Sequence, residues 1–219
     1  MKPLLSRQTK GALRIVAIGG GTGLSNLLHG LKHYMNCGAD SDGPIQAIEL
    51  TAVVTVADDG GSSGRLRREF DMLAPGDIRN CLVAMSADEA LLSKVFQYRF
   101  ASGKGLKGHT LGNLFLTAMT ELSGGDFARA VQHASDVLAT CGQIYPATVE
   151  KVVLEALLEN GKTIQGETKI SRSKSRIRRV RLKPARPKPL PETLEAIASA
   201  DLITMGPGSL FTSVIPNLL

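Results

Sequence analysis

Residues 13–25 of this 219-residue chain read LRIVAIGGGTGLS, and this stretch decides the fold. Residues 13–18 form an apolar run broken only by Arg14, three glycines follow, and apolar residues then recur at helical spacing over residues 24–31. The pattern predicts a strand, a tight turn and a helix. Backbone N–H groups and the helix dipole favour an anion at the start of such a helix. The turn therefore predicts a phosphate site.

Two further strands are predicted outward from this turn. Residues 50–57 are rich in Val and Thr and end at two aspartates and two glycines, and residues 202–205 form another buried strand. The last strand leads into Gly206-Pro207-Gly208-Ser209 and a helix to the end of the chain. These repeated units predict an α/β fold with a Rossmann-like, doubly wound and mostly parallel sheet. Such sheets normally continue with more strands, so we expect a domain truncated at its C-terminus.

The middle of the chain predicts an inserted helical layer. Residues 75–138 are helical in pattern, and helix starts are predicted at Pro75, Ser86, Thr110 and Asp126. Within residues 110–122 one apolar stripe is predicted to face the core, and it consists of Leu111, Leu114, Phe115, Ala118, Met119 and Leu122.

A β-hairpin excursion is predicted after these helices. Residues 149–158 and 162–167 flank Asn160-Gly161, a pair that favours a type I′ turn. An exposed strand at residues 177–182 and a short helix at residues 194–200 follow. We expect residues 1–11 to be a flexible N-terminus and residues 12–219 to form a single domain, because this length supports one sizeable core.

The positive charge of the chain is concentrated in one segment. The formal net charge is +6, and residues 169–188 hold ten basic and no acidic residues. Without them 16 basic and 20 acidic residues remain, a net charge of −4. The alternation of basic and apolar residues favours the solvated face of an edge strand. Nucleic acid is the alternative partner, but an aromatic content of 4% with no Trp makes stacking platforms scarce, so we do not expect it.

Composition favours a cytoplasmic protein. No segment approaches the roughly 18 consecutive apolar residues that a membrane span needs, and the N-terminus lacks the apolar stretch of a signal peptide. The three cysteines share no CxxC spacing, so neither a disulfide framework nor a zinc site is indicated.

The glycine turns are the first candidate site. The residues predicted to bind a ligand there are Gly20, Gly21, Thr22 and Gly23, joined by Gly206, Gly208 and Ser209. Two such turns at one sheet edge would hold the two phosphates of a diphosphate. The first turn departs from GxGxxG and lacks the Lys-Ser/Thr of a P-loop, so neither a dinucleotide nor a P-loop NTPase is supported. Tight packing is the alternative role of the first turn, and helix capping by Ser209 is that of the second.

Polar residues after the second strand form another candidate group. Asp58 and Asp59 stand at the carboxyl edge of the sheet, where either would hold a ribose hydroxyl or a Mg²⁺ bound to phosphates. The alternative for both residues is that they only stabilise the turn and bind no ligand. Arg65 follows among small hydroxyls and suits phosphate recognition, with a solvated helix start as its alternative.

Polar residues at two later helix starts complete the candidates. Asp77 and Thr110 are predicted first as N-caps, and Asn80 and Asn113 are costly inside helices unless bonded. His109 is either a ligand contact and general acid or a structurally bonded histidine. All of Asp77, Asn80, His109 and Asn113 are retained as ligand-binding candidates, and no residue is assigned a catalytic role.

Five blocks in this order carry a resemblance to a known family. They are GGGTG at residues 19–23, VADDGGSSGRLR at 56–67, PGDIRN at 75–80, GHTLGN at 108–113 and GPGSLFTSVIPNL at 206–218. Together they resemble the gluconeogenesis-factor family, also described as UDP-sugar-binding morphogenesis proteins, within the superfamily of 2-phospho-L-lactate transferase. The resemblance implies a UDP-sugar such as UDP-N-acetylglucosamine as ligand, and a role in cell shape under gluconeogenic growth. Family members usually extend past the last block.

Three classes of function follow. The leading hypothesis is a regulatory protein that binds a nucleotide sugar without turnover. Mg²⁺ is the one cofactor considered, and a homo-oligomer is left open. The alternative is a transferase that moves a phosphorus-containing group from a nucleotide diphosphate, with carboxylates holding magnesium. The third is a nucleic-acid-binding module that uses residues 169–188.

Overall fold

The computed structural model describes residues 12–35, 48–87 and 89–219. The predicted flexible terminus, residues 1–11, lies outside the described residues.

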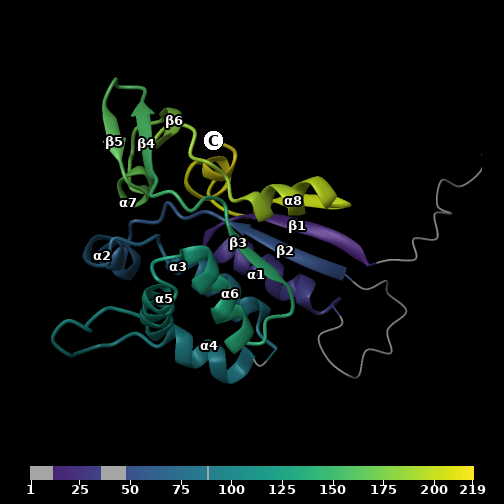
Figure 1. The fold of residues 1–219 in the computed structure, drawn as a ribbon. Helices are drawn as coiled ribbons and strands as arrows, with labels where there is room; N and C mark the ends of the chain where they lie inside the picture. The colour runs from purple at the N-terminus through teal and green to yellow at the C-terminus, as the bar shows by residue number, and fades with distance from the viewer. Residues whose placement is uncertain (1–11, 36–47, 88) are drawn as a thin grey trace, which may run out of the picture.

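A four-stranded parallel sheet lies at the centre of the fold (Figure 1). Its strands, in the spatial order β3-β2-β1-β7, are β3 (Gln143–Pro146), β2 (Ile48–Val54), β1 (Leu13–Gly19) and β7 (Leu202–Met205). Strands β1 and β2 pair over their full length, from Leu13 opposite Ile48 to Gly19 opposite Val54. Both strands are apolar runs because helices cover the two faces of the sheet.

Helices pack on both faces, as the prediction of a doubly wound sheet requires. One face carries α1 (Gly21–Lys32), α3 (Gly76–Met85) and α6 (Phe127–Val137), whose apolar residues join the main hydrophobic core. The other face carries α8 (Pro191–Ser199), where Ile197 packs on Val16 and Val53. Figure 1 shows α8 and α1 on opposite sides of the strands. The predicted α/β, Rossmann-like class is confirmed.

The predicted helical layer is present, and two of its starts are capped as expected. It adds α2 (Gly61–Glu69), α4 (Glu89–Gln97) and α5 (Leu111–Leu122). The Thr110 side chain accepts a hydrogen bond from the Asn113 N–H, and the Asp126 carboxylate accepts one from the Arg129 N–H. Each side chain thereby satisfies a donor that the first helical turn leaves unpaired.

The predicted core face of α5 is only partly right, since Leu114 and Phe115 pack against the core but are not its most buried residues. The buried residues of this helix are Gly112, Asn113, Leu116, Thr117 and Thr120, whereas Leu122 is 80% exposed. This polar face tolerates burial because its hydroxyl groups form hydrogen bonds within the helix. The hydroxyls of Thr117 and Thr120 donate to the carbonyls four residues earlier, at 2.9 and 2.7 Å. The absence of a side chain at Gly112 also brings Arg79 and Phe96 close to the helix.

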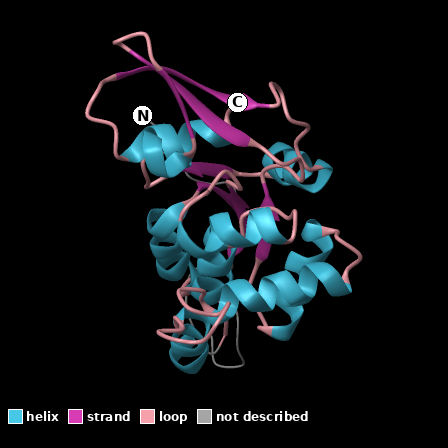
Figure 2. Cartoon of the chain, turned by 90° about the vertical axis from the view of Figure 1, so that its left-hand side faces the viewer, coloured by secondary structure: helices cyan, strands magenta, loops and turns pink. Residues whose placement is uncertain are grey.

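A small antiparallel sheet projects beside the main sheet (Figures 1 and 2). Its order is β5 (Thr163–Gln165), β4 (Val153–Leu158) and β6 (Ile177–Lys183), and the short helix α7 (Glu167–Ser171) follows β5. The predicted hairpin and the predicted edge strand are both confirmed.

The basic face of β6 is not simply solvated. Glu155 on β4 is 2% exposed and forms ion pairs with Arg181 and Lys183, while Gln165 donates to it at 2.8 Å. These contacts hold the pKa of Glu155 at about 2, with the Lys183 and Gln165 hydrogen bonds as the leading causes.

The last strand and helix differ from their predictions. Strand β7 was predicted to be buried, but Leu202, Ile203 and Met205 are 44–61% exposed because β7 lies at the edge of the sheet. The predicted final helix is a π-helical turn, η1 (Leu210–Val214), followed by a 3₁₀ turn, η2 (Ile215–Asn217).

Two cysteines lie in the described part of the chain. Cys81 is a buried thiol, and Cys141 is disulfide-bonded, which the spacing of the cysteines did not predict. Across residues 12–35, 48–87 and 89–219, every helix is too short or too polar to cross a bilayer.

Candidate functional site at the carboxyl edge of the sheet

The order of the strands creates a switch point between β1 and β7. The chain moves from β1 to β2 and β3 on one side, and β7 adds to the other side of β1. Open α/β sheets bind ligands at the carboxyl ends of strands where the order reverses in this way. Both predicted glycine turns lie there, since one follows β1 and the other follows β7.

The two turns are in direct contact. A Cβ atom on Gly23 would lie 2.3 Å from the carbonyl oxygen of Pro207, and one on Gly208 would lie 3.6 Å from that of Gly20. The Gly206 N–H also donates to the carbonyl of Ile18 at 2.8 Å. The turns that the sequence predicts to share one ligand are therefore neighbours, and this close approach requires glycine at position 23.

The two turns differ in exposure. Gly20 and Gly206 are buried, Thr22 is exposed, and Gly208 and Ser209 are also exposed. Ser209 precedes η1 but makes no side-chain capping hydrogen bond, so the capping role considered for it is absent. The open part of the site consists of the first turn of α1 and the loop 207–209.

Asp77 reaches the first glycine turn from α3. A Cβ on Gly20 would lie 2.7 Å from its Oδ2, and its carboxylate accepts the N–H of Gly21, which has a φ of +65°. Asp77 is not the predicted N-cap, because α3 starts after Pro75 and has no side-chain cap. Burial raises the pKa of Asp77 to about 6, with Asp58 raising it further, and the Gly21 hydrogen bond and Arg79 oppose the shift.

Asp58 and Asp59 point in different directions. Asp58 Oδ1 accepts the Gly60 N–H at 2.7 Å, and its Oδ2 lies 2.9 Å from the Cβ position of Gly76. Asp59 Oδ1 accepts both the N–H and the hydroxyl of Thr168, each at 2.9 Å. Among the described residues no group of three or more His, Cys, Asp or Glu side chains is arranged to hold a metal ion. A magnesium ion here would need phosphate oxygens as additional ligands.

Glu167 was missed by the sequence reasoning. It opens α7, far along the chain, yet the carboxylates of Asp58, Asp77 and Asp59 all raise its pKa. Burial is the largest cause, and the pKa of Glu167 reaches about 8 although Thr212 donates a hydrogen bond to it. No local motif marks this residue, because only the placement of the small sheet brings it to the site.

Arg79 connects the predicted site residues Asn80 and Asn113 with the helix cap Thr110. Its guanidinium donates to Thr110 Oγ1 at 2.7 Å, to Asn113 Oδ1 at 3.1 Å and to Asn80 Oδ1 at 2.6 Å. The structure thus brings Asn80 and Asn113 together, bonded to a side chain that the sequence reasoning did not select.

His109 belongs to the same network. It is 2% exposed, and its Nδ1 lies 2.9 Å from Ser62 Oγ, which also accepts a bond from Asn113 at 3.0 Å. Burial, followed by the charge of Arg65, lowers the pKa of His109, so the neutral imidazole predominates at neutral pH. Arg65 itself donates to the Lys107 carbonyl at 2.8 Å and lies beside Gly108 rather than at a glycine turn.

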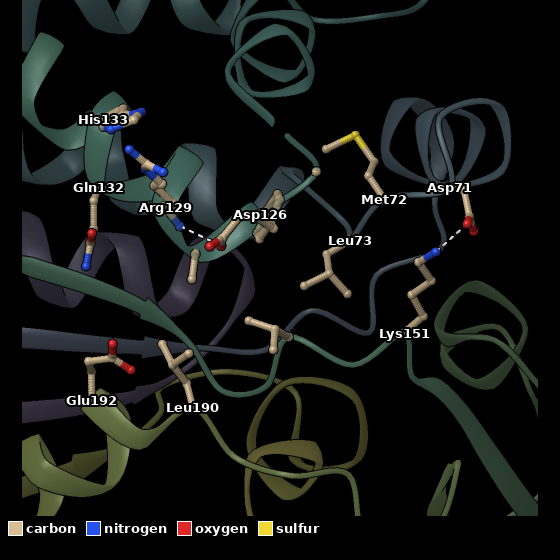
Figure 3. Close-up of a pocket in the computed structure, with 14 residues that line it drawn as sticks. Asp71, Met72, Leu73, Asp126, Arg129, Gln132, His133, Lys151, Leu190 and Glu192 are labelled. Carbon is tan, nitrogen blue, oxygen red and sulfur yellow. Dashed lines mark hydrogen bonds and ion pairs between the residues drawn. The ribbon is translucent and has the colours of Figure 1, made fainter. Parts of the chain in front are cut away.

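A concave surface adjoins the first turn of α1. This cavity of about 390 Å³ is lined by the predicted residues Thr22 and Asn80, and by Arg79 and Arg99. A larger cleft of about 630 Å³ lies between α6, α8 and the loops around residues 72 and 150. Figure 3 shows its ion pair between Asp71 and Lys151 and the capping bond of Asp126. None of the predicted site residues lines the larger cleft.

A doubly wound sheet with two touching glycine turns at its switch point defines a Rossmann-like class of α/β protein, and such turns are suited to binding an anionic group. Residues 15–219 match the family model described as 2-phospho-L-lactate transferase CofD, and the chain belongs to this family.

Similar proteins share most of this chain but are longer. The chain is 51% identical to the gluconeogenesis factor of Bacillus subtilis and 51% identical to that of Halalkalibacterium halodurans, covering 94% of this chain in both cases and 61% and 60% of those proteins. A putative gluconeogenesis factor of Nostoc sp. is 54% identical and is covered over 42% of its length. A crystal structure of a Bacillus halodurans protein of the UPF0052 family superposes with a TM-score of 0.86 at 50% identity, covering 95% of this chain and 63% of that one. The chain therefore spans about two fifths to three fifths of these relatives.

Proposed function

We propose that this protein binds a nucleotide sugar of the UDP-N-acetylglucosamine type and acts as a regulatory protein of cell shape during gluconeogenic growth. The diphosphate lies against the backbone N–H groups of residues 22–23 and 208–209, and Asp58 or Asp77 contacts a ribose or sugar hydroxyl. The contact between the two glycine turns carries this proposal. The similarity to gluconeogenesis factors supports the cellular role, and we expect the protein to act in the cytoplasm.

The carboxyl groups of the site are suited to binding hydroxyls. The elevated pKa values of Asp77 and Glu167 leave a larger share of protonated carboxyl than ordinary acids would have. A protonated carboxyl repels a diphosphate less than a carboxylate does, and it also donates a hydrogen bond. Magnesium, where it binds, neutralises the charge of the phosphates next to Asp58.

Calorimetry with UDP-N-acetylglucosamine, with and without Mg²⁺, tests the proposal. We expect saturable binding by the 219-residue chain. Gly208→Asp places a carboxylate at an exposed corner of the site, with its Cβ 3.1 Å from that of Ser213, and it should weaken binding at least tenfold while circular dichroism shows the variant to be folded. Gly30→Asp is the matched control, since position 30 of α1 has open space around it and lies away from the turn. Equal binding by both variants, or no heat of binding in the unmodified chain, contradicts the proposal.

Transfer of a phosphorus-containing group is the second candidate, because the matching family model is named for a transferase. Chromatography of the nucleotide after incubation separates the two functions. Intact UDP-N-acetylglucosamine supports binding without turnover. Release of UMP or UDP that depends on the protein and on Mg²⁺ supports the transferase.

A further inference from the structure

The lining of the cavity beside α1 carries positive charge without a lining carboxylate among the described residues. Arg79 and Arg99 line it, and its lining within the described part of the chain includes no Asp or Glu. Two further cavities also hold arginines, but both contain carboxylates. The 630 Å³ cleft has Asp71, Asp126 and Glu192, and a 430 Å³ cavity near α2 has Asp59 and Asp71. In those two cavities, lining carboxylates accompany the arginines. In the cavity beside α1, no lining carboxylate does so among the described residues.

The two guanidinium groups donate hydrogen bonds to neutral partners. Arg79 is fixed by its three bonds to Thr110, Asn113 and Asn80, and its Nε is buried with no hydrogen-bond partner among the described residues. Arg99 donates from Nη1 to the Gly108 carbonyl at 2.7 Å. Burial and then the like charge of Arg99 lower the pKa of Arg79, and the charges of Asp77 and Asp58 outside the cavity lining oppose this shift. Two adjacent cations in a concave site are stabilised when an anion binds between them.

The cavity also offers neutral hydrogen-bonding groups and enough room for a monosaccharide. Thr22 and Ser25 line it from the first two turns of α1, and Ser93 and Gln97 line it from α4. A volume of about 390 Å³ lies within the range typical of small-molecule sites. Because Thr22 belongs to the turn proposed to bind the diphosphate, a group attached to that diphosphate reaches the cavity directly.

We propose that this cavity binds an anionic group on the sugar of the ligand, a carboxylate or a phosphate in addition to the diphosphate, between Arg79 and Arg99. The inference rests on the proposed function and narrows it to acidic nucleotide sugars. Arg99 is the residue that distinguishes acidic from neutral sugars, because Arg79 is already committed to the protein by three bonds.

Two nucleotide sugars that differ only at C6 test the inference. UDP-glucuronate carries a carboxylate where UDP-glucose carries a hydroxymethyl group. Calorimetry on the 219-residue chain should give a Kd for UDP-glucuronate at least tenfold lower than that for UDP-glucose. Arg99→Gln should reduce this ratio to about one, and Arg99→Lys, which keeps the charge, should retain a preference of several-fold. Arg129→Gln, in the larger cleft, is the matched control and should keep the full ratio.

The outcomes separate this inference from the proposed function. Equal affinities for the two sugars in the unmodified chain overturn the inference and leave nucleotide-sugar binding intact. If neither sugar binds, the proposed function fails, and inorganic phosphate becomes the probe of the cavity. Phosphate binding that Arg99→Gln removes and Arg129→Gln retains keeps the cavity as an anion site. Phosphate binding that is absent, or indifferent to Arg99, overturns the inference as well.

Discussion

At the residue scale, Gly23 is a position at which a single added methyl group would push the two glycine turns apart. A Cβ there would lie 2.3 Å from the Pro207 carbonyl oxygen, which belongs to the backbone of the opposing turn. Relief of this clash requires the two turns to separate. Glycine at position 23 is therefore needed both for the contact between the two turns and for the proposed phosphate site.

Gly23→Ala should destabilise the protein by about 1–3 kcal/mol, the usual cost of overpacking a tight contact. Gly30→Ala on the same helix meets no atom within 4 Å and should stabilise by about 0.5–1 kcal/mol, because alanine favours a helix. Urea denaturation followed by circular dichroism measures both changes. Equal midpoints for the two variants would show that the turns are not in contact.

Local motifs revealed part of the site. The glycine turns, Asp58 and Asp77 stand at strand ends or helix starts, where a short pattern is sufficient to select them. Arg79 was overlooked because an arginine inside a helix resembles a solvated one, although this one is bonded to Thr110, Asn80 and Asn113. Glu167 and Arg99 come from elements that reach the site only through the tertiary fold.

At the element scale, strand and helix positions followed from hydrophobic period and capping residues, but which faces are buried did not. Three of the four parallel strands (β1, β2 and β7), the hairpin and the Thr110 and Asp126 caps were predictable, whereas strand β3 and the short helix α7 were not predicted. The buried face of α5 was not, since bonded threonines and a glycine there replace apolar side chains. Strand β7 is apolar yet exposed because its position at the sheet edge depends on topology.

The small sheet depends on the charge of Glu155. Glu155→Gln keeps the shape of the side chain but leaves Arg181 and Lys183 next to each other without a carboxylate. Hydrogen exchange of the β4 and β6 amides should accelerate at least tenfold, while exchange in β1 and β2 stays unchanged. Glu159→Gln, at the exposed end of the same hairpin, is the control. Unchanged protection of β4 in Glu155→Gln would mean that these ion pairs do not support the sheet.

At the scale of the whole molecule, the carboxyl cluster makes stability depend on pH. In the folded state the pKa values of Asp77 and Glu167 are about 6 and about 8, above their ordinary values of 3.8 and 4.5. The folded state therefore binds more protons than the unfolded chain between these limits. Their contribution to stability is complete below about pH 4 and is lost as the pH rises through 6 and 8.

The urea midpoint should accordingly be lower at pH 8.5 than at pH 5. Glu167→Gln should flatten the decline between pH 6 and 8, because its amide does not titrate, and Glu159→Gln should leave the decline unchanged. Glu155 acts in the opposite direction in a separate range, since its pKa of about 2 makes its contribution disappear only in acid. A midpoint that rises from pH 5 to pH 8.5 would contradict the placement of Glu167 beside the aspartates.

The central claim is that both glycine turns bind one diphosphate at the switch point between β1 and β7. A crystal structure of the chain with UDP-N-acetylglucosamine tests it most directly. We predict density for both phosphates within about 2.7–3.2 Å of backbone nitrogens in residues 22–23 and 208–209. Nucleotide bound in the 630 Å³ cleft, with both turns empty, would contradict the account.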